Sequence, residues 1–166
     1  MNRSLSEAYV LMFEFIDWWS GVASIFPEDV SNLYVSSIVE DADLANDRIG
    51  TVDPAAWDDW RHAVAMTFDG FIEAPVPIPC RSDGGDLNAG TTIDGDRAFL
   101  AVYLYFRNYW ERGKFSEEGI YEFLLELWNA INGIRVGEQN LLHRKFMEIW
   151  QLGDLSNPTE AFNRFR

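Results

Sequence analysis

The chain has 166 residues, of which 48% are hydrophobic and 24% charged, a balance that excludes wholesale disorder and leaves one domain or two small fused units. Its 13 Lys and Arg residues against 27 Asp and Glu give a formal net charge of −14, which disfavours nucleic acid and anionic membrane surfaces as partners. The single cysteine, Cys80, excludes an internal disulfide.

The first predicted helix covers about residues 5–20, where apolar side chains recur every three or four positions. Ser4 and Glu7 have the spacing of a capping box at its start. Acidic residues interrupt the apolar stretch and no small-residue cleavage site follows it, which argues against a signal peptide. No apolar run is long enough to span a membrane, so we expect a cytoplasmic protein.

Two further helices are predicted before residue 69. One begins with Pro27 at a first helical position, and an acidic loop over about residues 39–50 follows it. The other begins at Asp53 and Pro54, a capping residue followed by a proline that suits the first turn. Its predicted buried stripe consists of Trp57, Trp60, Val64 and Phe68.

Residues 69–95 break the helical pattern. Prolines at every second position exclude a helix and a central strand, and glycines follow, so we expect an extended Pro/Gly-rich connector. Aspartates and glycines between Asp83 and Asp94 resemble a calcium loop in composition. Gly85 and Leu87 would stand at ligand positions, however, so no metal site is expected.

The second half is predicted to be helical again. Helices are expected over about residues 97–112, from Ser116 to a stop at Gly133, over about 138–152, and briefly after Asn157 and Pro158. Their inward residues are expected to be Ile120, Phe123, Leu124, Leu127, Ile131, Leu141, Leu142, Phe146, Ile149, Trp150 and Phe162.

The two halves match without gaps at an offset of 90, for example Trp60 with Trp150 and Leu33 with Phe123. This favours a duplicated three-helix unit, although any two amphipathic runs agree at apolar positions. We therefore predict an all-α fold of about six helices. It is divided into an acidic helical unit (1–68), the connector (69–95) and a second helical unit (96–166).

Negative charge is concentrated in the first half. Residues 1–80 have a net charge of −11 and residues 81–166 one of −3. This asymmetry fits attraction of a cationic partner, and it equally fits a surface selected for solubility. The densest acidic patch contains Glu40, Asp41, Asp43 and Asp47, and Arg48 is the nearest cation. The patch is interpreted either as a partner-binding surface or as a solvated loop.

No catalytic constellation emerges from the sequence. His62 and His143 form no metal-binding or triad pattern, and the acid pairs Asp58-Asp59 and Glu117-Glu118 fit the first turns of helices without catalysis. We therefore expect neither an enzyme nor a cofactor. Trp18 and Trp19 are adjacent on one helix, so one of them is expected to be partly exposed and to suit an interface.

The motifs Ser6-Glu7-Ala8-Tyr9-Val10-Leu11-Met12-Phe13-Glu14-Phe15-Ile16 and Asp53-Pro54-Ala55-Ala56-Trp57-Asp58-Asp59-Trp60 are similar to those of small acidic helical bacterial proteins. These proteins resemble the immunity partners of contact-dependent or polymorphic toxins. The similarity covers about residues 4–66 and, more loosely, 96–150. The third helix of the second half lacks the Asp-Pro start, and the connector lies outside the pattern.

The resemblance implies a non-enzymatic immunity protein whose acidic surface neutralises a basic toxin domain, expected to be a nuclease. The alternative is a helical adaptor that binds a peptide or subunit in an apolar groove. The residues expected to bind the basic partner are Glu40, Asp41, Asp43, Asp47, Asp58, Asp59 and Trp18.

Overall fold

The fold is mainly α-helical, as predicted. The computed structural model describes residues 1–22, 28–68, 87–88, 90–113, 117–137 and 140–165. In chain order, these residues form β1 (Arg3–Ser4), α1 (Leu5–Val22), α2 (Glu28–Ser36), β2 (Val39–Asp43), the 3₁₀-helix η1 (Leu44–Asn46), β3 (Arg48–Thr51), α3 (Ala55–Met66), β4 (Thr92–Ile93), α4 (Gly95–Gly113), α5 (Glu117–Arg135), α6 (Leu141–Leu152) and α7 (Glu160–Phe165).

Two of the predicted helix starts are confirmed by their hydrogen bonds. The Ser4 backbone N–H donates to Glu7 Oε2 at 2.9 Å, and the Glu7 N–H donates to Ser4 Oγ at 3.3 Å, which completes the capping box. At α3, the Asp53 carboxylate accepts a hydrogen bond from the Ala55 N–H at 3.0 Å. The predictions that rest on Pro27, Ser116, Cys80 and residues 69–86 lie outside the described residues.

The prediction of an acidic loop over residues 39–50 is wrong, because this segment is an antiparallel β-hairpin of β2 and β3. Val39, Ile49 and Thr51 point inward and are buried, while the acidic residues of β2 are exposed. The register shifts between Val39 and Asp41, and this irregularity interrupts the alternation by which a strand is recognised in a sequence.

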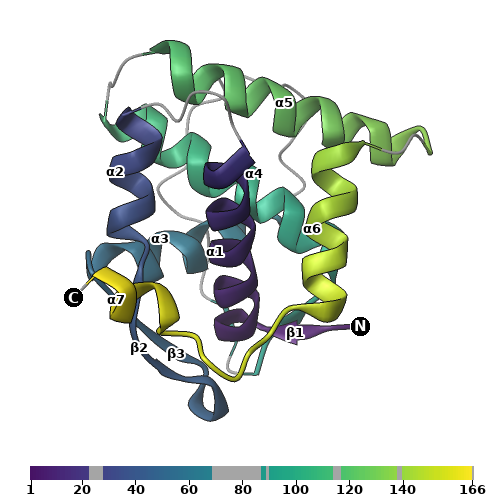
Figure 1. Ribbon diagram of the computed structural model, residues 1–166. Helices are drawn as coiled ribbons and strands as arrows, with labels where there is room; N and C mark the ends of the chain where they lie inside the picture. The colour runs from purple at the N-terminus through teal and green to yellow at the C-terminus, as the bar shows by residue number, and fades with distance from the viewer. Residues whose placement is uncertain (23–27, 69–86, 89, 114–116, 138–139, 166) are drawn as a thin grey trace.

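The two predicted units share one hydrophobic core cluster, which runs from Leu5 to Trp150. Figure 1 shows α1 in the middle, with α2 and α6 on either side and α5 across one end. Helix α3 packs mainly against α4 and helix α6 against α1, while β1 pairs with β4, so each half contacts the other closely. Trp60 and Trp150 each donate an indole hydrogen bond to the N-terminal segment, at Leu5 O and Met1 O (both 3.1 Å).

Three details differ from the predicted helix faces. Phe68 is 50% exposed and does not continue the buried stripe of α3. The Arg97 guanidinium carbon lies over the Phe68 ring, 4.0 Å from the ring centroid. Leu141 is 62% exposed at the start of α6. Helix α5 continues through Gly133 to Arg135, because a glycine within a helix lowers its stability without ending it.

Gly153 lets the end of α6 lie close to α1. A Cβ atom at this position would stand 2.5 Å from the Ile149 carbonyl oxygen and 2.9 Å from Glu14 Oε2, and it would also meet the Leu11 side chain. We expect Gly153→Ala to lower the free energy of unfolding by about 1–3 kcal/mol, as overpacking does, measured by chemical denaturation. Gly21→Ala is the control, because a Cβ at that helical position meets nothing within 4 Å. Equal effects of the two substitutions would contradict this account.

Candidate functional site

Three of the predicted partner-binding residues lie together on β2. Glu40, Asp41 and Asp43 are all exposed on this strand. Hydrogen bonds from the Asn46 side chain (2.7 Å) and the Asn46 backbone N–H (3.2 Å) lower the pKa of Asp43. The hairpin therefore favours the charged form of Asp43, beside the exposed side chains of Glu40 and Asp41.

Asp47 supports the fold rather than presenting a free carboxylate. It follows η1 in the left-handed region, with φ 55°, a conformation that aspartate tolerates better than most residues. Its Oδ1 accepts a hydrogen bond from the Ser6 N–H at 2.7 Å, in the first turn of α1. The carboxylate thus satisfies an unpaired donor at the positive end of α1 and ties the hairpin to that helix.

We expect Asp47→Ala to lower the free energy of unfolding by about 1–2 kcal/mol, the usual loss when a helix cap is removed. Asp41→Ala, on the exposed face of the same hairpin, should change it by less than about 0.5 kcal/mol. Urea denaturation of both variants measures the difference. Equal stabilities would mean that the bond from Ser6 contributes nothing.

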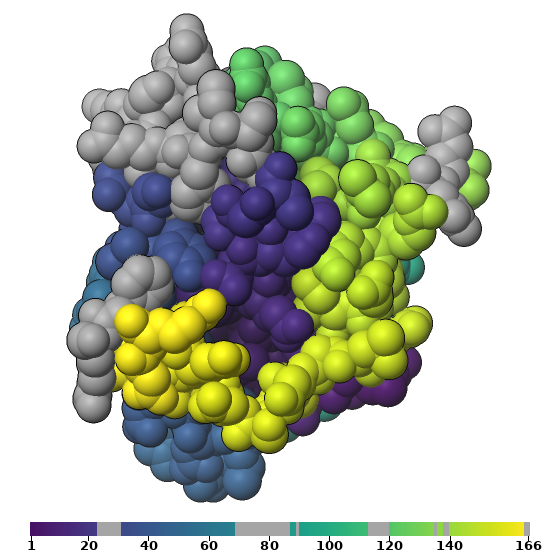
Figure 2. Space-filling model, viewed as in Figure 1, coloured from purple at the N-terminus to yellow at the C-terminus, as the bar shows by residue number. Residues whose placement is uncertain are grey.

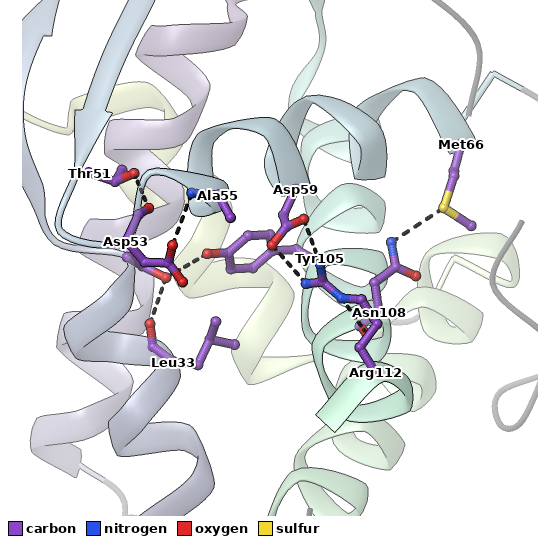
Figure 3. A network of polar contacts seen from close by, with 10 residues as sticks. Leu33, Thr51, Asp53, Ala55, Asp59, Met66, Tyr105, Asn108 and Arg112 are labelled. Carbon is purple, nitrogen blue, oxygen red and sulfur yellow. Dashed lines mark hydrogen bonds and ion pairs between the residues drawn. The ribbon is translucent and has the colours of Figure 1, made fainter. Parts of the chain in front are cut away.

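The two predicted partner-binding carboxylates on α3 have different surroundings. Asp58 is exposed, whereas Asp59 accepts two hydrogen bonds from Arg112 of α4, at 2.8 and 2.7 Å (Figure 3). A two-point arginine–carboxylate contact fixes both groups in orientation and balances their charges. Asp59 therefore connects α3 to α4 and adds little to the negative surface.

A cavity of about 250 Å³ lies beside this ion pair, with Tyr105 in its wall. Ser37 Oγ donates to the Leu33 carbonyl at 2.7 Å, so the Tyr105 hydroxyl, 2.6 Å from Ser37 Oγ, is the donor in their contact. Burial raises the pKa of the Tyr105 phenol. The hydroxyl thus stays protonated and connects α4 to the end of α2, without the base that a nucleophile requires.

Trp18 is the partly exposed member of the tryptophan pair, as expected, and Trp19 is buried. The Trp18 ring stacks on Phe15 with centroids 5.8 Å apart, and Lys145 Nζ lies 5.6 Å from its centroid. These contacts turn Trp18 toward α6. It therefore lies apart from the β2 carboxylates with which the sequence grouped it.

The structure forms an acidic pocket that sequence reasoning missed. Glu14 and Asp17 of α1, Asp154 and Glu160 line a cavity of about 240 Å³. Arg164 of α7 also lines it and pairs with Asp17 at 3.7 Å. Asp17 further accepts a hydrogen bond from the Tyr34 hydroxyl at 2.7 Å. Four carboxylates thus surround one space, with one arginine among the residues that line it.

The folded chain disfavours the anionic form of Glu14 in this pocket. Partial burial raises its pKa, and the neighbouring charges of Asp154, Asp17 and Glu160 raise it further, while Lys145 opposes them. Asp154 behaves oppositely: hydrogen bonding to the Ser156 side chain, and a hydrogen bond from the Ser156 N–H at 2.8 Å, lower its pKa. A cation placed in the pocket would therefore relieve repulsion that the folded chain now contains.

Helix α7 joins the acidic pocket to the hairpin. Its Ala161 packs in a small cluster with Phe13 and Ile38, and α7 contacts β2. Figure 2 shows α7 (yellow) next to the hairpin (blue) on one face of the molecule. We call this surface the acidic face. Its carboxylates are those of Glu14, Asp17, Glu40, Asp41, Asp43, Asp154 and Glu160.

Other kinds of site find no support within the part of the chain that the structure describes. No group of three or more His, Cys, Asp or Glu side chains there is arranged to hold a metal ion. His143 Nε2 lies 3.0 Å from Asp96 Oδ1 at the surface, with no nucleophile in this contact. None of the helices over those residues combines the length and the apolar character that crossing a membrane requires.

No family model, no curated protein and no solved structure matches this chain.

Glu14 provides a test of the pocket through the pH dependence of stability. Because the folded state raises the pKa of this acid, it binds the proton more tightly than the unfolded chain, and stability falls as pH rises toward the folded pKa. We expect Glu14→Gln to be more stable than the parent chain at neutral pH. The difference should shrink as pH falls from the raised pKa of the folded state toward the ordinary value of 4.5, and it should not change further below that value. Thermal denaturation across pH measures it, and a stability gain that does not change with pH would contradict the assignment.

Proposed function

We propose that this chain is a non-enzymatic bacterial immunity protein that binds and neutralises a basic toxin domain, expected to be a nuclease. The observation that supports the proposal is the acidic face, where exposed carboxylates of β2 adjoin a pocket lined by four more. A nuclease holds its phosphate substrate with cationic side chains. A surface of carboxylates is complementary to such a groove and would compete with the nucleic acid for it.

The pocket is suited to a single basic side chain of the partner. Its volume of about 240 Å³ is below the roughly 300–1,000 Å³ typical of small-molecule sites. A lysine or arginine that entered it would stabilise the ionised form of Glu14, whose pKa the folded chain raises. Partly desolvated charge pairs contribute more to affinity than exposed ones, so the pocket would hold the partner while β2 speeds its approach.

The adaptor hypothesis differs in its response to salt. Association through carboxylates and cations weakens as ionic strength rises, because exposed charges are screened over about 8–10 Å at 0.1–0.15 M salt. Burial of apolar surface in a groove does not weaken in this way. Strong salt dependence would therefore support the immunity function, and salt-insensitive binding would support the adaptor.

The decisive experiment measures association with the protein encoded by the adjacent reading frame. We expect the triple variant Glu40→Lys, Asp41→Lys, Asp43→Lys to slow association at least about tenfold. We expect Asp154→Lys mainly to speed dissociation. The matched control is Glu122→Lys with Glu126→Lys, two exposed carboxylates on α5 that lie outside the acidic face.

Stopped-flow fluorescence at several salt concentrations would separate the two rates. A neighbouring protein that does not bind, or a control variant that weakens binding as much as the β2 variant, would contradict the proposed function.

A further inference from the structure

Helix α6 presents an outward face that no described part of the chain covers. Its inner side, Phe146, Ile149 and Trp150, is buried in the core. On the opposite side Leu141 is 62% exposed and Leu152 79% exposed, and the Arg144 and Glu148 side chains between them also face solvent. We call these four residues the α6 stripe. They recur at helical spacing along one side of the helix.

The α6 stripe is complementary to a second copy of itself that runs in the opposite direction. It has a leucine at each end, with a cation and a carboxylate between them. If two copies of α6 lie antiparallel about a two-fold axis that passes between Phe146 and Met147, Leu141 of one copy meets Leu152 of the other. In this register Arg144 lies one residue along the helix, about 1.5 Å, from the position directly opposite Glu148 of the second copy, and each of these contacts occurs twice. This reciprocity is the requirement for an isologous dimer interface.

A groove beside the stripe provides room for the incoming leucines. It has a volume of about 500 Å³, and Ile134, Met147 and Leu152 contribute its apolar lining. Val136, at the end of α5, is 72% exposed nearby in the sequence. An exposed leucine of a second copy would therefore exchange water for apolar contacts on this surface.

Charge also favours this face for self-association. The whole chain carries −14, so most of its surface repels a second copy. Helix α6 carries two cations, Arg144 and Lys145, against the single carboxylate of Glu148, to which Lys145 lies at 3.1 Å. Arg144 has no ion-pair partner among the residues described, which leaves it available to a second copy.

We propose that the chain forms a weak two-fold dimer through the α6 stripe, with Arg144 of each copy paired to Glu148 of the other. A helix of 12 residues is about 18 Å long, so the interface lies at the small end of the range for specific contacts. The expected dissociation constant is in the high micromolar range. None of the four stripe residues lines the acidic pocket or belongs to β2, so the proposed dimer uses other residues than the acidic face. This proposal does not depend on the proposed function.

Sedimentation velocity of the full chain from micromolar to millimolar concentration tests the dimer. The wild type should shift from monomer to dimer over this range. Arg144→Glu and Glu148→Arg should each weaken dimerisation at least about tenfold, because each places like charges opposite one another. The double variant Arg144→Glu with Glu148→Arg restores opposite charges and should recover the dimer to within about threefold of wild type.

The apolar contribution has its own control. Leu152→Ser should weaken the dimer, whereas Val35→Ser, at an exposed apolar position on α2, should not. Circular dichroism would verify that each variant remains folded. A wild type that stays monomeric at every concentration, or a charge swap that fails to restore association, would overturn the proposal.

Discussion

The structure depends on the burial of α1. Every residue from Ala8 to Phe13 is buried, so this helix is apolar around most of its circumference and has to be enclosed on several sides. Helices α2, α4 and α6 enclose it. Glu14 and Asp17 lie on its remaining polar edge, which α7 and the segment after α6 approach. The acidic pocket is thus a direct consequence of how α1 is enclosed.

The carboxylates of this acidic chain divide into two groups by their surroundings. Asp47 and Asp59 are satisfied within the molecule, one by a backbone N–H at the start of α1 and the other by an arginine of α4. They connect elements and contribute to stability. The carboxylates of the acidic face have few cations nearby, and for Glu14 the folded state is itself unfavourable to the charged form. At Glu14 a cationic partner would relieve this unfavourable energy.

The interlocking of the two halves brings the acidic pocket next to the hairpin. Helix α7 belongs to the second half in sequence, yet it packs against β2 and α1 of the first half. The same exchange brings α3 onto α4 and β1 onto β4. Segments distant in the sequence therefore form each face of the molecule. The acidic face and the α6 stripe share no residue, and the stripe has one cation and one carboxylate where the acidic face has seven carboxylates.

The helical class, the capping box of α1, the cap of α3 and most of the inward residues of α5 were predictable from the sequence, because they depend on spacing within a few neighbouring residues. The sequence also located the exposed acids of β2. The hairpin escaped prediction because an irregular register masks its alternation. The structural roles of Asp47 and Asp59 and the pocket of Glu14 were decided by tertiary structure alone, since their partners stand from about 40 to 150 residues away in the chain. Local pattern cannot indicate which distant group will face a carboxylate, and that neighbour decides whether the charge stabilises the fold or remains available for binding.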